Sequence, residues 1–194
     1  MLTSSSRPRS LWIAIGVLAL LLLWSITSYN GLVASGETVA TNFAQVETQM
    51  QRRVDLIPNL VATVRGAAAF EQETFREITE ARSRWQGASD RPEKVRAASD
   101  LDGALSRFLL TVENYPALQA TQAFRDLMVQ LEGTENRISV ARRDYNDAVR
   151  AYNVRVKRVP GRLVAGIFGF REEEFYEATE GAEIAPTVEF KPEE

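Results

Sequence analysis

The side chains in this sequence that could carry chemistry are carboxylates, arginines and tyrosines, because the chain contains neither histidine nor cysteine. The lack of histidine removes the commonest general base and the commonest zinc ligand. The lack of cysteine removes disulfides, thiolate metal sites and thiol nucleophiles. Catalysis or metal binding would therefore depend on clusters of Asp, Glu, Arg, Lys or Tyr, and three stretches are dense enough to be considered.

The first stretch holds Arg52, Arg53 and Asp55, shortly before Pro58 in the run RRVDLIPNL. A proline removes a backbone donor and crowds the preceding turn, so we expect a helix to kink or restart there. Basic side chains at such a break could bind an anion or a lipid headgroup. The alternative, which the sequence favours, is a solvated face with local ion pairs that contribute little to stability.

The second stretch is a polar run formed by Glu132, Glu135, Asn136, Arg137, Arg142, Arg143, Asp144 and Asn146. Glu135 and Asn136 lie beside an apolar seam, so we expect them to form a buried polar network with the residues near Pro58 that fixes helix register. The alternative is a catalytic or metal-binding carboxylate pair. Di-metal helical bundles, however, use Glu-x-x-His from two helices, which requires histidine. We expect no catalytic, cofactor-binding or metal-binding residue.

The third stretch is Glu172, Glu173 and Glu174. These carboxylates could bind a cation or a basic partner, but a solvated acidic terminus is the favoured interpretation. Tyr145 and Tyr152 fall on the apolar seam of their helix, so we expect them to pack in the core.

The charge is unevenly distributed along the chain. The net charge is −3, and residues 171–194 contain nine glutamates against Arg171 and Lys191, a balance of −7. The remainder is therefore +4, without a basic patch interleaved with aromatic residues. Nucleic acid is not an expected partner.

The elements that position these residues are long helices, predicted from apolar residues at seven-residue spacing. Two rows cover residues 30–86, one of Phe43, Met50, Ile57, Val64, Ile78 and Trp85, the other of Leu32, Val39, Val46, Leu60 and Ala67. Arg53 interrupts the second row. Pro58 predicts that this region is divided into two helices, roughly 30–56 and 59–86.

Two further breaks divide the rest of the chain. The first covers residues 87–92, where Asp90 and Glu93 form a capping-box pattern before a helix over about 91–113. The second ends at Pro116, a favourable first helical residue. The last long helix is predicted from there to about 158, with a buried row of Phe124, Leu131, Ile138, Tyr145, Tyr152 and Val159. The segment LVAGIFGF, residues 163–170, is expected to pack as a turn or short helix against one end of the bundle.

Residues 11–28, LWIAIGVLALLLLWSITS, contain no charge. A helix of this length spans roughly 27 Å, about the thickness of the bilayer's hydrocarbon core. Trp12, Trp24 and Tyr29 lie near its ends, where amphipathic rings suit the headgroup level. The alternative is a cleaved signal peptide, but the apolar stretch is long for one and its best cleavage site is poor. Arg7 and Arg9 place the N-terminus in the cytoplasm by the positive-inside rule.

The fold class predicted from these patterns is all-α, with an N-terminal transmembrane helix followed by an antiparallel up-and-down bundle of three to four long helices. The expected organisation is a short tail over residues 1–10, a transmembrane helix over 11–28, the bundle over 29–170 and an acidic tail over 171–194.

Several long segments resemble the LemA family. They are YNGLVASGETV (29–39), FAQVETQMQRRVDLIPNLVATVRG (43–66), ENYPALQATQAFRDL (113–127), QLEGTENRISVARRDYNDAVRAYN (130–153) and LVAGIFGF (163–170). The resemblance implies a single-pass membrane protein with an antiparallel helical bundle and no established enzymatic activity. One departure is Phe70-Glu71, where the family pattern often has His-Glu, which argues against a metal role for that position.

These observations predict a membrane-anchored, non-enzymatic helical bundle that acts as a scaffold or interaction module at the bacterial cell envelope. The expected partners are the lipid bilayer through residues 11–28, other membrane or envelope proteins and a second copy of the chain, with no cofactor. The alternative is an enzyme, or a regulatory subunit of one, that acts on a lipid or cell-wall substrate through carboxylates and arginines.

Overall fold

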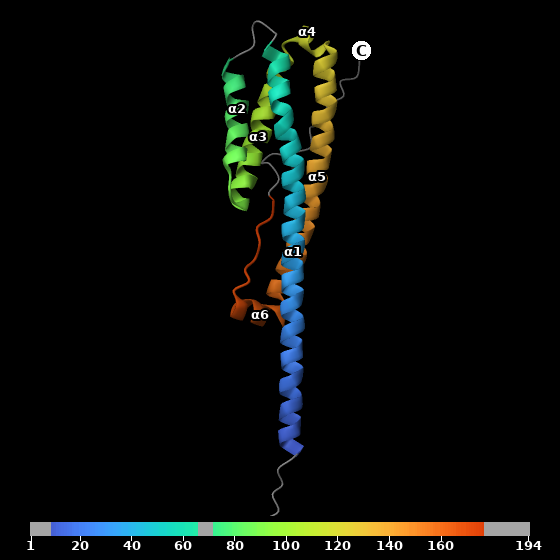
Figure 1. Cartoon of the computed structure of the whole chain (residues 1–194), viewed down its shortest axis with the longest axis vertical. Helices are drawn as coiled ribbons and strands as arrows, with labels where there is room; N and C mark the ends of the chain where they lie inside the picture. Colours follow the sequence, from blue (N-terminus) through green and yellow to red (C-terminus); the bar gives the residue numbers. More distant parts are fainter. Residues whose placement is uncertain (1–8, 66–71, 177–194) are drawn as a thin grey trace, which may run out of the picture. The chain divides into compact units, whose positions relative to one another are not determined.

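The computed structural model describes residues 9–65 and 72–176. Its helices are α1 (Arg9–Arg65), α2 (Gln72–Gly87), α3 (Arg91–Val112), α4 (Pro116–Gln119), α5 (Gln122–Lys157) and α6 (Gly161–Phe168) (Figure 1). The described residues fall into two compact units. We name residues 9–47 and 139–175 the anchor unit, and residues 48–65, 72–138 and Tyr176 the bundle unit. α1 and α5 contribute to both.

The bundle unit consists of the end of α1, then α2, α3, α4 and the beginning of α5, with the long helices running alternately up and down (Figure 1). The described residues at the predicted heptad positions of this unit are buried, including Ile57, Leu60, Val64, Ile78 and Trp85. Burial of one apolar side of each helix is the main force that holds such bundles together. The all-α antiparallel prediction is therefore confirmed.

The connection between α2 and α3 follows the predicted capping pattern. The side chain of Asp90 accepts a hydrogen bond from the backbone N–H of Glu93 at 2.8 Å. The Glu93 carboxylate in turn accepts from the backbone N–H of Ser89 at 3.1 Å. Unpaired backbone donors at the start of α3 are thus satisfied within the chain, which places the turn as the sequence predicts.

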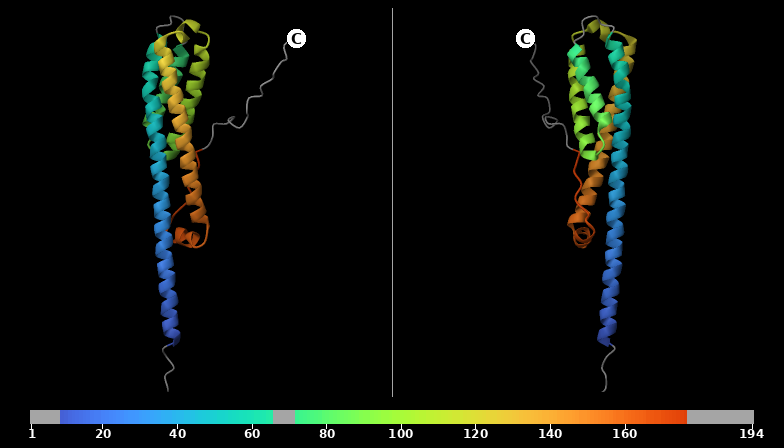
Figure 2. Two further views of the ribbon diagram at one scale, coloured as in Figure 1. Left: turned by 90° about the vertical axis from the view of Figure 1, so that its right-hand side faces the viewer. Right: turned by 60° about the vertical axis from the view of Figure 1, so that its left-hand side comes forward.

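The anchor unit consists of the first part of α1, the last part of α5, α6 with its cap Gly169, and an extended segment over residues 170–175. α5 runs beside α1 in both views of Figure 2. The core between them is formed by Leu32, Val39, Phe43, Val46, Ala141, Tyr145, Ala148, Val149, Tyr152 and Val156. The Phe43 and Tyr145 rings meet edge-on at 5.5 Å between centroids. Alternation of alanines with large aromatic residues lets the two helices approach closely.

The turn between α5 and α6 depends on Gly161. A Cβ atom at this position would lie 2.0 Å from the backbone oxygen of Arg155, closer than any side chain tolerates. α6 ends at Gly169, whose φ of 77° is the left-handed conformation that glycine adopts without strain. Glycine at both ends therefore allows α6 to fold back beside α5, as a short helix of the kind the sequence predicts.

The predicted division at Pro58 is wrong. α1 continues through Pro58 to Arg65, and the described residues of the predicted helix 59–86 belong to the end of α1 and to α2. Residues 66–71, among them Ala67 and the Phe70-Glu71 pair, lie outside the described residues. α1 remains continuous at Pro58 because Arg82 of α2 donates a hydrogen bond to the backbone oxygen of Val54, which Pro58 leaves without its partner in the helix.

The predicted single helix over 116–158 is also corrected. α4 ends at Gln119 and α5 begins at Gln122, because the Thr121 hydroxyl accepts a hydrogen bond from the backbone N–H of Phe124 at 3.4 Å and so caps a new helix. At the other end α5 stops at Lys157. Val159, predicted to be buried, is 70% exposed because it lies beyond the helix.

Candidate functional site

The apolar N-terminal part of α1 has no partner in the described part of the chain. By length and composition, α1 is the one described helix that can cross a membrane. Its large apolar side chains from Leu11 to Ile26 are exposed, whereas those of Leu32 and Val39 are buried in the core of the anchor unit. An apolar helix surface of this extent is stable in lipid and unstable in water. The protein is therefore membrane-associated.

A buried arginine occupies the core of the bundle unit. The guanidinium of Arg53 in α1 pairs with Asp102 in α3, at 2.5 Å between Nη1 and Oδ1, and with Glu135 in α5. The Arg53 side chain is only 2% exposed, whereas the side chains of Asp102 and Glu135 are 17% and 53% exposed. One charge thus links three helices at a heptad position that would otherwise be apolar. We expect this triad to fix the register of the helices.

The remaining polar residues near the triad lie apart from it. Arg52 donates to Gln49 at 3.4 Å and Asp55 accepts from Gln51 at 2.7 Å, both on the exposed side of α1. The other residues of the polar run in the bundle unit, which are also exposed, are Glu132, Asn136 and Arg137. In the anchor unit, Arg143 pairs with Asp144 at 3.7 Å, and Arg142 and Asn146 are partly buried. Of the predicted network, the structure brings together Arg53 and Glu135.

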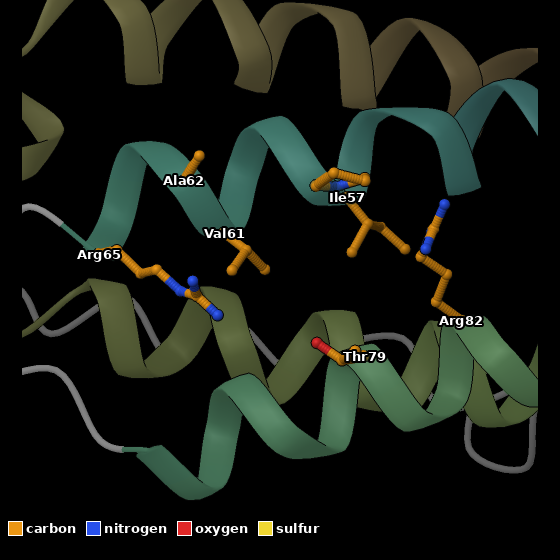
Figure 3. Close-up of a pocket in the computed structure, with 7 residues that line it drawn as sticks. Ile57, Val61, Ala62, Arg65, Thr79 and Arg82 are labelled. Atoms are coloured by element: carbon orange, nitrogen blue, oxygen red, sulfur yellow. The ribbon is translucent and has the colours of Figure 1, made fainter.

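The region around Pro58 contains a pocket of about 260 Å³ between α1 and α2 (Figure 3). Proline has no N–H, so the carbonyl oxygen of Val54, four residues earlier, loses its partner within the helix. The Nε of Arg82 in α2 donates to that oxygen at 3.3 Å. Figure 3 shows Arg82 reaching toward α1 beside Ile57. Arg82 therefore satisfies the group that Pro58 leaves unpaired, and α1 continues.

An extended segment, residues 170–175, is tied to α5 in the anchor unit, and we name it the strap. The side chain of Asn153 donates to the backbone oxygen of Glu173 at 2.8 Å and accepts from its N–H at 2.9 Å. The Tyr145 hydroxyl donates to the backbone oxygen of Glu174 at 2.9 Å, and Lys157 pairs with Glu172 at 2.8 Å. The three glutamates are thus held mainly through their backbone.

Replacement of Asn153 by Ala is expected to release the strap, because it removes the two hydrogen bonds between the Asn153 side chain and the Glu173 backbone. Such a loss amounts to about 1–3 kcal/mol. Hydrogen exchange of full-length protein, read on peptides covering residues 170–175, should become about tenfold faster. Val154→Ala, an exposed neighbour on α5, is the matched control, and equal exchange in the two variants would contradict this role of Asn153.

Burial raises the pKa of Tyr152 above its usual range, and the nearby negative charge of Glu173 adds to this shift. The folded protein therefore keeps the tyrosine proton to a higher pH than the unfolded chain does. The stabilisation is complete below the unfolded value of about 10 and is lost as the pH rises through the folded pKa. Tyr152→Phe is expected to reduce the decline in unfolding free energy above about pH 10, which urea titrations at neutral and alkaline pH would measure. An identical decline in both proteins would count against it.

The membrane-proximal end of the anchor unit holds an aromatic cluster and a groove. The Tyr29 ring lies 4.8 Å from that of Phe168 and 5.6 Å from that of Phe170, between centroids. The groove, of about 530 Å³, lies between α1 and the end of α5. Its lining residues are Trp24, Thr27, Ser28, Gly31, Leu32, Ala151, Val154, Arg155, Arg158, Val159, Pro160 and Gly161. The Arg155 guanidinium donates to the backbone oxygen of Gly31 at 2.8 Å.

Three residues that form the contacts described above were not predicted from the sequence: Asp102 of the triad, Arg82 near Pro58 and Asn153 beside the strap. Asp102 follows Leu101 and lies three and seven residues from Leu105 and Leu109, so its heptad position was a usable signal. Arg82 and Asn153 carry no such signal, because their acceptors lie 28 and 20 residues away in the sequence.

Comparison with known proteins places these features in a family context. The model of the LemA family matches residues 42–190. Magnetosome protein MamQ 2 of Paramagnetospirillum magneticum is 27% identical over 175 residues, 77% of this chain and 64% of that relative. Magnetosome protein MamQ of Magnetospirillum gryphiswaldense is 27% identical over 197 residues, 87% of this chain and 72% of the relative. Protein LemA of Metamycoplasma hominis is 22% identical over 128 residues, 66% of this chain and 58% of the relative. The chain thus spans less than two thirds of the length of MamQ 2.

Proposed function

The chain belongs to the LemA family, and from that membership and its exposed apolar helix we propose that it is a membrane-anchored, non-enzymatic scaffold of the bacterial cell envelope. The observation that carries the proposal is the change of surroundings along α1. Its large apolar side chains are exposed from Leu11 to Ile26, and from Leu32 onward one side of the same helix is buried in protein. In this proposal a single helix, α1, both spans the membrane and contributes to the core of the domain that follows.

Anchoring to the membrane helps a domain without a catalytic site to bind other membrane proteins. A protein confined to the plane of the membrane meets other membrane proteins at a higher effective concentration than in solution. The described apolar residues exposed on the bundle unit, such as Leu110 and Val129, stand singly, as on an ordinary soluble surface. Partner binding by this unit would then rely mainly on its polar and charged faces.

The proposed orientation has the N-terminus in the cytoplasm and the soluble domain outside it. Arg7 and Arg9 flank the apolar segment on its N-terminal side, whereas Arg52 and Arg53 are the first basic residues after it. Arginines further along the chain carry little weight in this rule, because charges far from the segment in sequence contribute little to insertion.

Fractionation of cells that express the full-length protein tests the anchor. The protein should stay with membranes after extraction with alkaline carbonate and enter the supernatant only with detergent. A variant with Leu18 and Leu21 replaced by arginine should be released, because a charge at the centre of a spanning helix costs about 2.5–3.5 kcal/mol per residue. Full release of the unaltered, unprocessed chain by carbonate would refute the proposed anchor.

Sidedness and partners require two more measurements on the same material. Ser89→Cys introduces the only thiol of the chain at an exposed turn. Labelling of this thiol in intact cells by a membrane-impermeant maleimide supports the proposed orientation, and labelling only after lysis opposes it.

Crosslinking in native membranes, followed by mass spectrometry, then identifies partners. Recovery of no protein crosslinked to the bundle unit would argue against a scaffold.

A further inference from the structure

The exposed apolar side chains of the anchor unit continue past the membrane-spanning segment onto α6. In α6, Val164 and Ala165 are buried, whereas Leu163 and Ile167 are 60% and 77% exposed. The two exposed residues are four positions apart and so lie on one face of the helix. α6 thus has apolar residues on two faces. One face is buried against the protein, and the other is exposed.

The position of α6 identifies what covers this open face. Phe168 packs on Tyr29, which directly follows the apolar stretch of residues 11–28. α6 lies crosswise beside α1, next to the end of α5 (Figure 1). A short helix held at this level, with apolar side chains on its open side, meets the boundary between headgroups and acyl chains.

The groove between α1 and α5 opens at the same level. Trp24, Thr27 and Ser28 on its wall belong to the apolar stretch itself, and Arg155 and Arg158 line the opposite wall. An acyl chain could lie along the Trp24 side, and a phosphate could lie against the guanidinium groups. The groove therefore combines the two kinds of contact that a phospholipid makes.

Charge complementarity selects the headgroup. Arg158 and Arg162 are exposed, and within residues 9–65 and 72–176 neither forms an ion pair with a carboxylate. Lys157, by contrast, is paired with Glu172 of the strap. Two arginines without a described counter-charge, beside a membrane-spanning helix, attract anionic lipid.

We propose that α6 and the groove between α1 and α5 form a binding site for an anionic phospholipid at the membrane surface. Leu163 and Ile167 insert at the interface, and Arg158, supported by Arg155 and Arg162, holds the lipid phosphate. The soluble domain is then held to the bilayer at two points, the spanning helix and α6. This inference rests on the proposed membrane-spanning helix.

The insertion of α6 is tested with full-length protein in vesicles of phosphatidylcholine, with and without phosphatidylglycerol. Ile167→Cys is labelled with an environment-sensitive fluorophore, which attaches at one position because the chain has no cysteine. Blue-shifted emission and quenching by nitroxide-labelled lipid are expected. Ala40→Cys is the matched control, exposed on α1 about 17 Å further along the helix than Tyr29. If the label at 167 is as hydrated as the label at 40, the insertion of α6 is disproved.

Lipid selectivity is tested by native mass spectrometry of the full-length protein in neutral detergent, titrated with phosphatidylglycerol or phosphatidylcholine. The unaltered protein should prefer phosphatidylglycerol, and Arg158→Gln should weaken its binding about fivefold. Arg150→Gln removes the same charge from α5 outside the groove and should leave binding unchanged. Equal binding of the two lipids, or equal losses in the two variants, would overturn the site. Displacement of the lipid by inorganic phosphate would do so as well, because it would indicate a simple anion site.

The outcomes separate this inference from the proposed function. If the protein resists carbonate extraction but the label at residue 167 remains hydrated, the anchor stands and the α6 site fails. If carbonate releases the protein, the proposed function fails first, and the lipid titration in detergent still reports on the groove.

Discussion

Replacement of both carboxylates that face Arg53, in the variant Asp102→Asn with Glu135→Gln, is expected to lower the unfolding free energy by about 3–5 kcal/mol. The variant keeps the shape of both side chains but removes the two carboxylate charges that pair with the guanidinium of Arg53, whose side chain is only 2% exposed. Urea unfolding of full-length protein in detergent, followed by the fluorescence of Trp85 in the core of the bundle unit, measures the loss.

The reverse replacement should be milder. Arg53→Met fills the buried space with an apolar chain, and the carboxylates left behind are 17% and 53% exposed and can be hydrated. A loss larger than that of the double carboxylate variant would show that Arg53 acts by packing rather than by charge. Glu77→Gln removes an exposed pair that joins α2 and α3 at 2.9 Å, and its cost should stay below about 1 kcal/mol.

Replacement of Arg82 by Met should cost about 1–3 kcal/mol, because the Val54 carbonyl oxygen would lose its donor in a partly buried position. Pro58→Ala should stabilise the protein by about 2 kcal/mol, since alanine suits a helix interior and restores the missing N–H. In the Pro58→Ala background, Arg82→Met should cost much less. The double-mutant cycle, measured by the same unfolding titrations, should show a coupling of about 1–2 kcal/mol.

The matched control for this cycle is Arg84→Met, on the same helix. Its guanidinium pairs with Asp100 at 3.2 Å on an exposed surface, so its cost should be small and independent of residue 58. Additive effects of Pro58→Ala and Arg82→Met would mean that the Val54 oxygen finds another partner, such as water, when Arg82 is removed.

These two predictions concern the bundle unit, whereas the lipid site concerns the anchor unit, so they can be tested independently. A destabilised bundle unit should reduce partner crosslinking without changing membrane retention. The Arg158→Gln variant, which is expected to lose lipid selectivity, should leave the unfolding transition reported by Trp85 fluorescence unchanged. This separation follows from the placement of each group of residues within one unit.

The heptad rows show how much of the fold could be predicted. Phe43, Met50, Ile57 and Val64 are buried as their spacing predicts, because the side of a helix that a residue faces depends only on its position in a 3.6-residue turn. The apolar segment and the Asp90 cap were also predictable, since both depend on residues that are close in sequence. The prediction that Val159 is buried was wrong, because the seven-residue spacing does not specify where a helix ends.

Local spacing therefore decided the helices, their apolar sides and the membrane segment of this LemA-family protein. The tertiary structure decided what the polar groups contact. Arg53 finds carboxylates 49 and 82 residues away, and the acceptor of Arg82 is a carbonyl oxygen 28 residues earlier. The placement of α6 beside Tyr29 likewise depends on how α1 and α5 pack. The physical reason is that a repeat along one helix does not specify which residue of another helix stands opposite, and this pairing determines whether a buried charge or a proline is tolerated.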